Sequence, residues 1–289
     1  MVSKMKREWP DFFIVGAPRS GTTSLHEYLN QISEIFMCPQ ESGYFSKFSI
    51  GRVKTELEYK SLYNNSKNNQ LIGDATPDYL RDPETPSLIY KVNPKAKIII
   101  LLRDPIERTH SHYLKHIRNG YETKPFSKRF ADYKDDTRGS FHDYIIMPSF
   151  YFDSVSKYIN VFGDEQIKIC IYEEFAKNTK KIVREILDFL QIDSDLPSNI
   201  NKKYNEFAHP PQRSEQLLTS NYFSLHIAKR FLPKSTRSSI KNLLSDKNSK
   251  PKLEERDIIK LRELFNDDVD KLQNLLKRKL DWKHFPDTF

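Results

Sequence analysis

The chain has few cysteines and no long hydrophobic run, and both shortages narrow the class of protein. Cys38 and Cys170 are its two cysteines, too few for a disulfide framework, so a reducing cytoplasm is the expected location. No stretch approaches the roughly 18 apolar residues that span a bilayer. The polar segment 1–11 is not followed by a signal-peptide core. We therefore expect a cytoplasmic protein without a membrane span.

Motifs typical of nucleic-acid binding are also missing. The net charge is +8, from 47 basic and 39 acidic residues, a balance that suits nucleic acid, an acidic membrane surface or a small anionic ligand. Zinc-finger spacing, an RNA-recognition signature and basic-zipper heptads are absent. The densest basic group, residues 277–279, is predicted to be the solvated face of a terminal helix. We expect no nucleic-acid partner, and a nucleic-acid-binding protein stays the third class of function.

Short apolar runs alternate with amphipathic segments along the chain. This alternation predicts an α/β fold, in which a central parallel sheet is flanked by helices and ligands bind at the carboxyl ends of the strands. No repeat or linker divides the sequence, so a single domain over 1–289 is expected. Residues 253–280 are predicted to form two amphipathic helices or one broken helix. Strands are predicted at 12–15, 70–73, 97–102 and 166–172, and helices at 22–31, 105–119, 150–162 and 179–190.

A loop bounded by two glycines follows the first predicted strand. Gly16 and Gly21 have the spacing G-x-x-x-x-G, and the order of strand, loop and helix places backbone N–H groups where they can hold an anion. Thr22 fills the position at which a nucleotide triphosphatase carries its lysine, and the nearest cation is Arg19 inside the loop. A phosphate-like ligand is expected, without the usual ATP chemistry. A P-loop kinase of small molecules is the alternative enzyme.

A second anion-binding motif follows the most apolar predicted strand, 97–102. Asp104 is a suitable cap for a helix that begins with proline, which puts Arg103 at the carboxyl end of the strand. Ser111 lies two turns into that helix, so an arginine and a hydroxyl can reach one phosphate. The alternative is a surface pair between Arg103 and Asp104 or Glu107. Because both anion-binding elements lie on the same edge of the sheet, phosphate binding is favoured.

The two motifs resemble the signature segments of the sulfotransferases, which use 3′-phosphoadenosine 5′-phosphosulfate (PAPS). The segments are Gly-Ala-Pro-Arg-Ser-Gly-Thr-Thr at 16–23 and Leu-Arg-Asp-Pro at 102–105, with a serine eight residues beyond the arginine. The resemblance runs over residues 11–282 and implies a P-loop-like sulfotransferase fold. It implies transfer of a sulfuryl group to a hydroxyl or amine, release of adenosine 3′,5′-bisphosphate (PAP), and no metal. Three further segments resemble the glycan-modifying, heparan sulfate sulfotransferase-like branch: 39–45, 73–79 and 265–282.

The resemblance assigns residues to the two ends of the donor. Arg103 and Ser111 would hold the 3′-phosphate. Arg19 stands where relatives often carry lysine and would stabilise the oxygen that leaves sulfur. Its guanidinium is a planar, forked donor, whereas the ammonium of lysine is a point donor. The residues that would hold the 5′-phosphosulfate are Arg19, Ser20, Gly21, Thr22 and Thr23.

The resemblance also implies a general base. Glu41 matches the position of the base in the glycan-modifying branch, where a carboxylate takes the proton of the acceptor. In another branch a histidine does this, and His110, His112 and His116 are the local candidates. His112 and His116 lie four residues apart, which without a third ligand is a weak metal signal.

The acceptor site is implied less fully, and the acceptor is expected to be a carbohydrate or glycolipid. Steroids, phenols and lipids stay open as acceptors. A non-catalytic module that binds nucleotide or glycan stays open as an alternative function. Ala75 stands where some relatives have a lysine that assists the acceptor side. Candidate acceptor-binding residues are Asp74, Thr76, Tyr79, Ser149 and Tyr151. Basic residues in the region where relatives close over the nucleotide are Lys202, Lys203, His209 and Arg213.

Overall fold

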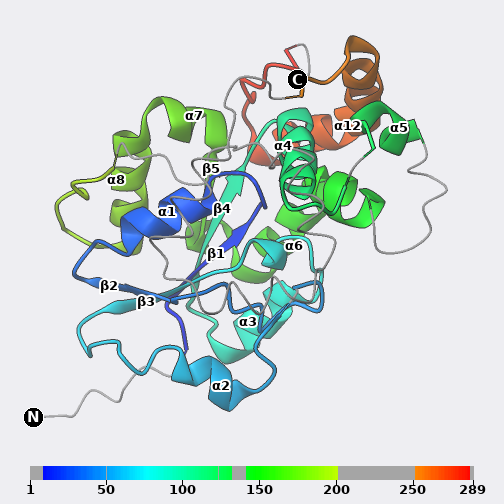
Figure 1. The fold of residues 1–289 in the computed structure, drawn as a ribbon. Coiled ribbons are helices and arrows are strands. Elements are labelled where there is room, and N and C mark those ends of the chain that lie inside the picture. Colours follow the sequence, from blue (N-terminus) through cyan, green and yellow to red (C-terminus); the bar gives the residue numbers. More distant parts are fainter. Residues whose placement is uncertain (1–8, 50, 123, 132–140, 201–250, 287–289) are drawn as a thin grey trace, which may run out of the picture.

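The structure is a computed structural model that describes residues 9–49, 51–122, 124–131, 141–200 and 251–286. Within these residues, five parallel strands form one sheet in the order β2-β3-β1-β4-β5 (Figure 1). The predicted parallel sheet is therefore confirmed. The strands are β1 (Phe12–Gly16), β2 (Ile35–Met37), β3 (Leu71–Ala75), β4 (Lys97–Leu102) and β5 (Ile167–Ile171).

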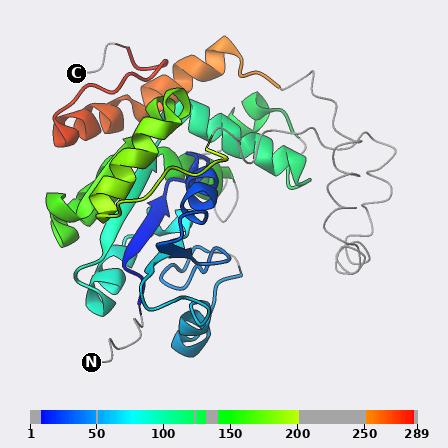
Figure 2. The same ribbon diagram turned by 90° about the vertical axis from the view of Figure 1, so that its left-hand side faces the viewer.

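Helices cover both faces of the sheet, which is why β1 is buried along its whole length and β4 along nearly all of it. One face packs against α1 (Thr22–Leu29), α7 (Tyr172–Lys177) and α8 (Thr179–Leu190). The other packs against α3 (Thr85–Val92) and α6 (Phe152–Phe162). Figure 2 shows from the side how α12 (Glu255–Leu276) lies beside α4 (Pro105–Arg118), and α12 contacts both α4 and α6.

Shorter elements complete the described part of the chain. No helix within it is long and apolar enough to cross a membrane. Cys38 and Cys170 are both buried and unpaired. The shorter elements are α2 (Glu56–Ser61), η1 (Pro77–Tyr79), α5 (Phe126–Ala131), η2 (His142–Ile146), η3 (Met147–Ser149) and η4 (Asp164–Gln166).

Two strands and the segment 253–280 differ from the sequence-based expectation. Strand β2 was not predicted, because three residues are too few to show a periodic pattern. Strand β3 runs to Ala75, so Asp74 lies inside the strand instead of at its end. The segment 253–280 holds a single unbroken helix, α12, in place of two helices or a broken one. Its buried Leu261, Phe265 and Val269 recur every four residues and keep one continuous apolar face.

The strand order places the two anion-binding motifs next to each other. The chain runs from β1 to β2 and β3 on one side of the sheet, and β4 and β5 lie on the other side. The order in which strands are added to the sheet therefore reverses direction. In open α/β sheets, ligands usually bind in the crevice beside such a point, at the carboxyl ends of the strands. The loop after β1 is tied to β4 by the N–H of Ala17, which donates to the carbonyl of Leu101 at 2.7 Å.

Candidate active site

The loop between β1 and α1 has a backbone that few residues can adopt. Arg19 has φ of 73° and Gly21 has φ of 91°, both in the left-handed region. Such turns make concave sets of N–H groups that bind anions, and a non-glycine residue there is strained. A Cβ atom on Gly21 would lie 3.1 Å from the ring of Tyr172 and 3.2 Å from that of Phe175. Glycine is therefore favoured at this position, because another residue would be strained in this backbone and would press on both rings.

The helix that follows the loop begins without a side-chain cap. Gly21 is the N-cap of α1, and no side chain accepts a hydrogen bond from the first turn. By contrast, the predicted cap of α4 is confirmed: Asp104 accepts hydrogen bonds from the N–H groups of Ile106 at 2.9 Å and Glu107 at 3.2 Å. Of these two helix N-termini, α1 is therefore the one whose N–H groups can serve an external anion.

Direct contacts join the first loop to the second motif. The Nε of Arg19 donates to the Oγ of Ser111 at 3.2 Å, and a terminal nitrogen of Arg103 donates to the carbonyl of Arg19 at 3.1 Å. The guanidinium of Arg103 lies on the ring of Tyr172, 4.6 Å from its centroid. The surface pair with Glu107 also exists, at 3.5 Å. It coexists with the contacts to the loop, so the two motifs form one site.

Two buried polar atoms of this site have no hydrogen-bond partner in the part of the chain that the structure describes. They are the Oγ of Ser20 and the Nε of Arg103. Thr22 is also buried, whereas Thr23 is exposed in the first turn of α1. Because buried polar groups are nearly always paired, these two donors are available to a polar ligand.

Positive charges crowd the same site. The pKa of Arg19 is lowered to about 10 by burial, and then by the charges of Arg118 and Arg103. Burial also lowers the pKa of Lys115, and the charge of Arg19 lowers it further. Sequence reasoning missed Lys115 and Arg118, although their spacing of four and seven residues from Ser111 puts all three on one helix face. Like charges held this close favour an anionic ligand.

The carboxylate predicted as the base, Glu41, is influenced by charges of both signs. Glu41 is exposed, and the next residue, Ser42, is anchored because its Oγ donates to Asp74 at 2.7 Å. Partial desolvation raises the pKa of the Glu41 carboxyl, Lys115 opposes that rise, and Asp78 adds to it. A carboxyl group with a raised pKa is a better proton acceptor once it is ionised.

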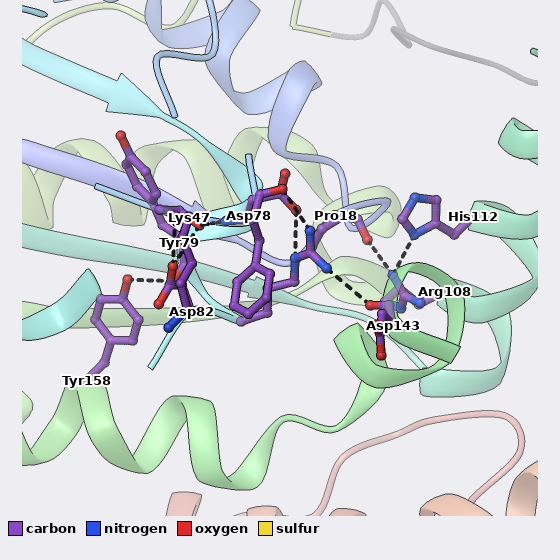
Figure 3. Close-up of polar contacts among 12 residues, drawn as sticks. Pro18, Lys47, Asp78, Tyr79, Asp82, Arg108, His112, Asp143 and Tyr158 are labelled. Carbon is purple, nitrogen blue, oxygen red and sulfur yellow. Dashed lines mark hydrogen bonds and ion pairs between the residues drawn. The ribbon is translucent and has the colours of Figure 1, made fainter. Parts of the chain in front are cut away.

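The candidate histidines are less suited to that role. The Nδ1 of His112 lies 3.1 Å from a terminal nitrogen of Arg108 (Figure 3). Because arginine only donates, Nδ1 is the acceptor and the neutral ring carries its proton on Nε2. Burial, then Arg108, holds the pKa of His112 well below its ordinary value. His116 packs its ring on His112, and His110 is buried. Glu41 is therefore the better candidate base.

Three predicted acceptor-binding residues belong to a buried hydrogen-bond network. Asp74 accepts hydrogen bonds from Ser42 at 2.7 Å, from Tyr59 at 2.8 Å and from Thr76 at 2.9 Å, and a fourth from Tyr79 at 3.1 Å. Asp74, Thr76 and Tyr79 each expose 1% of their surface or less. They offer an acceptor no open surface. We therefore assign them a role in supporting the segment that carries Glu41, in place of the contact with the acceptor that was expected from sequence.

The other two predicted acceptor-binding residues are also fully buried. Ser149 accepts a hydrogen bond from Nε of Arg108. The hydroxyl of Tyr151 donates to the carbonyl of Arg103 at 2.9 Å, which fixes the backbone beside the anion site. Neither residue therefore offers an acceptor open surface. The predicted basic loop, 202–213, lies outside the described residues. Within the described residues, no group of three His, Cys, Asp or Glu side chains is placed to hold a metal ion.

Comparisons with known proteins agree with this geometry. The model of the sulfotransferase domain matches residues 9–273. The chain is 24% identical over 296 residues to membrane-associated sulfotransferase kil1 of Dictyostelium discoideum, and 23% identical over 245 residues to carbohydrate sulfotransferase 15 of Mus musculus. These alignments cover 74% and 63% of this chain, but 63% and 44% of the relatives, so the chain spans about half of their length.

A solved structure is similar over nearly the whole chain. The sulfotransferase from Alicyclobacillus acidocaldarius has a TM-score of 0.71 and 26% identity, and the match covers 94% of this chain and 97% of that one. The family model spans the β1 loop, the Arg103 motif and most of α12. The protein is therefore a member of the sulfotransferase family, with the P-loop-like sulfotransferase fold.

Proposed function

We propose that the protein transfers a sulfuryl group from PAPS to a hydroxyl or amine of a carbohydrate or glycolipid. The observation that carries the proposal is the hydrogen bond from Arg19 to Ser111. It joins the loop that would hold the 5′-phosphosulfate to the helix that would hold the 3′-phosphate. Membership of the sulfotransferase family supports the reaction class, and PAPS is the donor that the sequence resemblance implies.

The residues at both ends of the site suit a doubly phosphorylated nucleotide. Ser20 and Arg103 each have a buried polar atom without a partner among the described residues, and the first turn of α1 has uncapped N–H groups. The phosphate groups of the nucleotide would neutralise the positive charges of Arg19 and Arg103. The residues that would hold the donor are Arg19, Ser20, Gly21, Thr22, Thr23, Arg103 and Ser111.

The side chains of the site can meet the chemical needs of sulfuryl transfer. When bound, PAPS supplies an activated sulfuryl group whose leaving group is PAP. A bond forms between the acceptor atom and sulfur, and the bond from sulfur to the 5′-phosphate oxygen breaks. Glu41 would take the proton that the acceptor loses. Arg19 and the N–H groups of α1 would stabilise the negative charge that develops on the leaving phosphate.

A carbohydrate acceptor is supported by relatives and by the position of the base. Carbohydrate sulfotransferase 15 matches 63% of this chain, and its name states its substrate class. Glu41 is exposed, so a large polar acceptor can approach it. A glycan or the sugar head of a glycolipid fits this open position.

The test is transfer of radiolabelled sulfate from PAPS to a panel of glycans, glycolipids, phenols and steroids. We expect label in a carbohydrate acceptor, and loss of transfer in Glu41→Gln with PAP affinity unchanged. Glu263→Gln, an exposed glutamate of α12, is the matched control and should keep full activity. Binding of PAP without transfer to any acceptor would contradict the proposal and favour a non-catalytic binding module.

A further inference from the structure

Arg108 of α4 is a buried cation that the proposed transfer does not use. Its side chain is fully buried, and no carboxylate of the described residues forms an ion pair with it. Burial lowers its pKa to about 10, and the nearby charges of Arg103 and Arg19 lower it further. Because a buried charge without a counter-ion costs free energy, the contacts of this guanidinium indicate what it contributes.

All three nitrogens of the Arg108 fork donate to neutral acceptors. Nε donates to Ser149, and one terminal nitrogen donates to the carbonyl of Ile145 in η2. The other terminal nitrogen donates to the carbonyl of Pro18 at 3.4 Å and to Nδ1 of His112 at 3.1 Å (Figure 3). This nitrogen carries two hydrogens, so it can serve both acceptors. Arg108 thus joins α4 and the η2–η3 segment to the loop between β1 and α1.

The contact with Pro18 fixes the direction of the next N–H group. The peptide between Pro18 and Arg19 is trans, so its carbonyl and its N–H point to opposite sides. Since the carbonyl is turned to Arg108, the N–H of Arg19 points away from it. Within the described residues, this N–H donates to no backbone carbonyl. The φ of 73° at Arg19 is strained for a non-glycine residue and persists only where the surroundings hold it.

The next carbonyl of the loop is held in a similar way. The carbonyl of Arg19 accepts a hydrogen bond from Arg103 at 3.1 Å. Two successive carbonyls are therefore tied to arginines of the second motif, and neither is left to face an anion. The first turn of α1 follows directly, and its N–H groups have no side-chain cap. An anion at this N-terminus would receive the N–H of Arg19 together with those of the first turn.

This inference rests on the proposed function, because it concerns the donor of that same transfer. We propose that Arg108 is a positioning residue that holds the Pro18 carbonyl, so that the N–H of Arg19 donates to the 5′-phosphate of the donor. The fork spans the loop on one side and the η2–η3 segment on the other, which requires several donors in fixed directions. The ammonium of a lysine keeps the charge but does not reproduce these directions.

The test combines titration calorimetry with PAP and NMR of the ¹⁵N-arginine-labelled full-length protein. The Arg19 amide signal is assigned by its loss in Arg19→Lys. On saturation with PAP, the wild-type amide proton should shift downfield, as expected for donation to a phosphate oxygen. In Arg108→Met this shift should be lost, and the Kd of PAP should rise about tenfold, which corresponds to about 1.4 kcal/mol. Arg108→Lys should show the same changes, because charge alone does not set the direction of the peptide.

Arg184→Met is the matched control. Arg184 of α8 also donates to a backbone carbonyl, that of Ser194 at 2.7 Å, but lies outside the two motifs. The control variant loses an arginine and its contact with a carbonyl, as Arg108→Met does. Its Kd for PAP and its Arg19 amide shift should equal those of the wild type.

The outcomes separate this proposal from the proposed function. A residue that only stabilises the fold would lower the free energy of unfolding in urea but leave the Kd and the amide shift unchanged; that result in Arg108→Met would overturn the role of Arg108. Full affinity in Arg108→Lys would mean that charge alone acts and would also overturn it. If the methionine variant does not fold, the lysine variant is measured with the same expectation. Absence of PAP binding to the wild type would instead refute the proposed function.

Discussion

Replacement of Arg103 by alanine should weaken PAP binding by a factor of about 30 to 150. The side chain of Arg103 is 15% exposed, and its Nε is buried without a partner in the described part of the chain. Hydrogen bonds to charged groups contribute about 1.5–3 kcal/mol, and a phosphate can take more than one nitrogen of the fork. We therefore expect a loss of about 2–3 kcal/mol, at about 1.4 kcal/mol per tenfold change in Kd.

The free protein should tolerate this substitution. Arg103 lowers the pKa of Arg19, so its removal relieves repulsion between like charges and offsets the lost contact with the Arg19 carbonyl. Unfolding by urea should therefore change little. Arg103→Lys keeps the charge but loses the planar fork, and its PAP affinity should lie between those of the wild type and the alanine variant.

Titration calorimetry with PAP measures these affinities. Arg256→Ala is the matched control, because Arg256 is an exposed arginine of α12 that pairs with Glu254. Its PAP affinity should equal that of the wild type. If Arg103→Ala folds normally and binds PAP within twofold of the wild type, the assignment of this strand end to a phosphate is refuted.

Three further predictions concern the loop, the base and its support. Gly21→Ala should cost about 1–3 kcal/mol and weaken PAP binding, because the new methyl group would meet the ring of Tyr172 in a left-handed backbone; thermal unfolding and calorimetry measure this. Turnover should fall as the pH drops through the raised pKa of Glu41, above the ordinary value of 4.5, because only the ionised carboxylate accepts a proton; His112→Asn should keep this acidic limb in a pH–rate profile. Asp74→Ala should lower the free energy of unfolding by about 3 kcal/mol in urea titrations, because four buried hydroxyl donors lose their acceptor.

The sequence was sufficient for the parts of the site that depend on local structure. The glycine spacing after a β-rich run predicted the strand, loop and helix around Gly21, and the structure contains them. The Asp104 cap was predicted from a suitable residue before a proline, and it is present. In both cases the signal lies within a few residues, where backbone sterics and hydrogen bonding decide the conformation. Location and domain number stay predictions.

The remaining features depend on contacts between residues far apart in the chain. Ser42 and Asp74 meet across 32 positions, and Tyr151 and Arg103 across 48. Burial of these polar side chains could not be anticipated, since each residue type is also common in open clefts. The spacing of Lys115 from Ser111 was visible, but the direction of that helix face depends on the packing of α4 beside the loop.

A crystal structure with bound PAP tests the central claim most directly. We predict a single bisphosphate that bridges the two motifs. Its 5′-phosphate should lie at the N-terminus of α1 beside Ser20, and its 3′-phosphate should contact Arg103 and Ser111. A nucleotide that contacts one motif alone, or that binds elsewhere on the protein, would contradict the account.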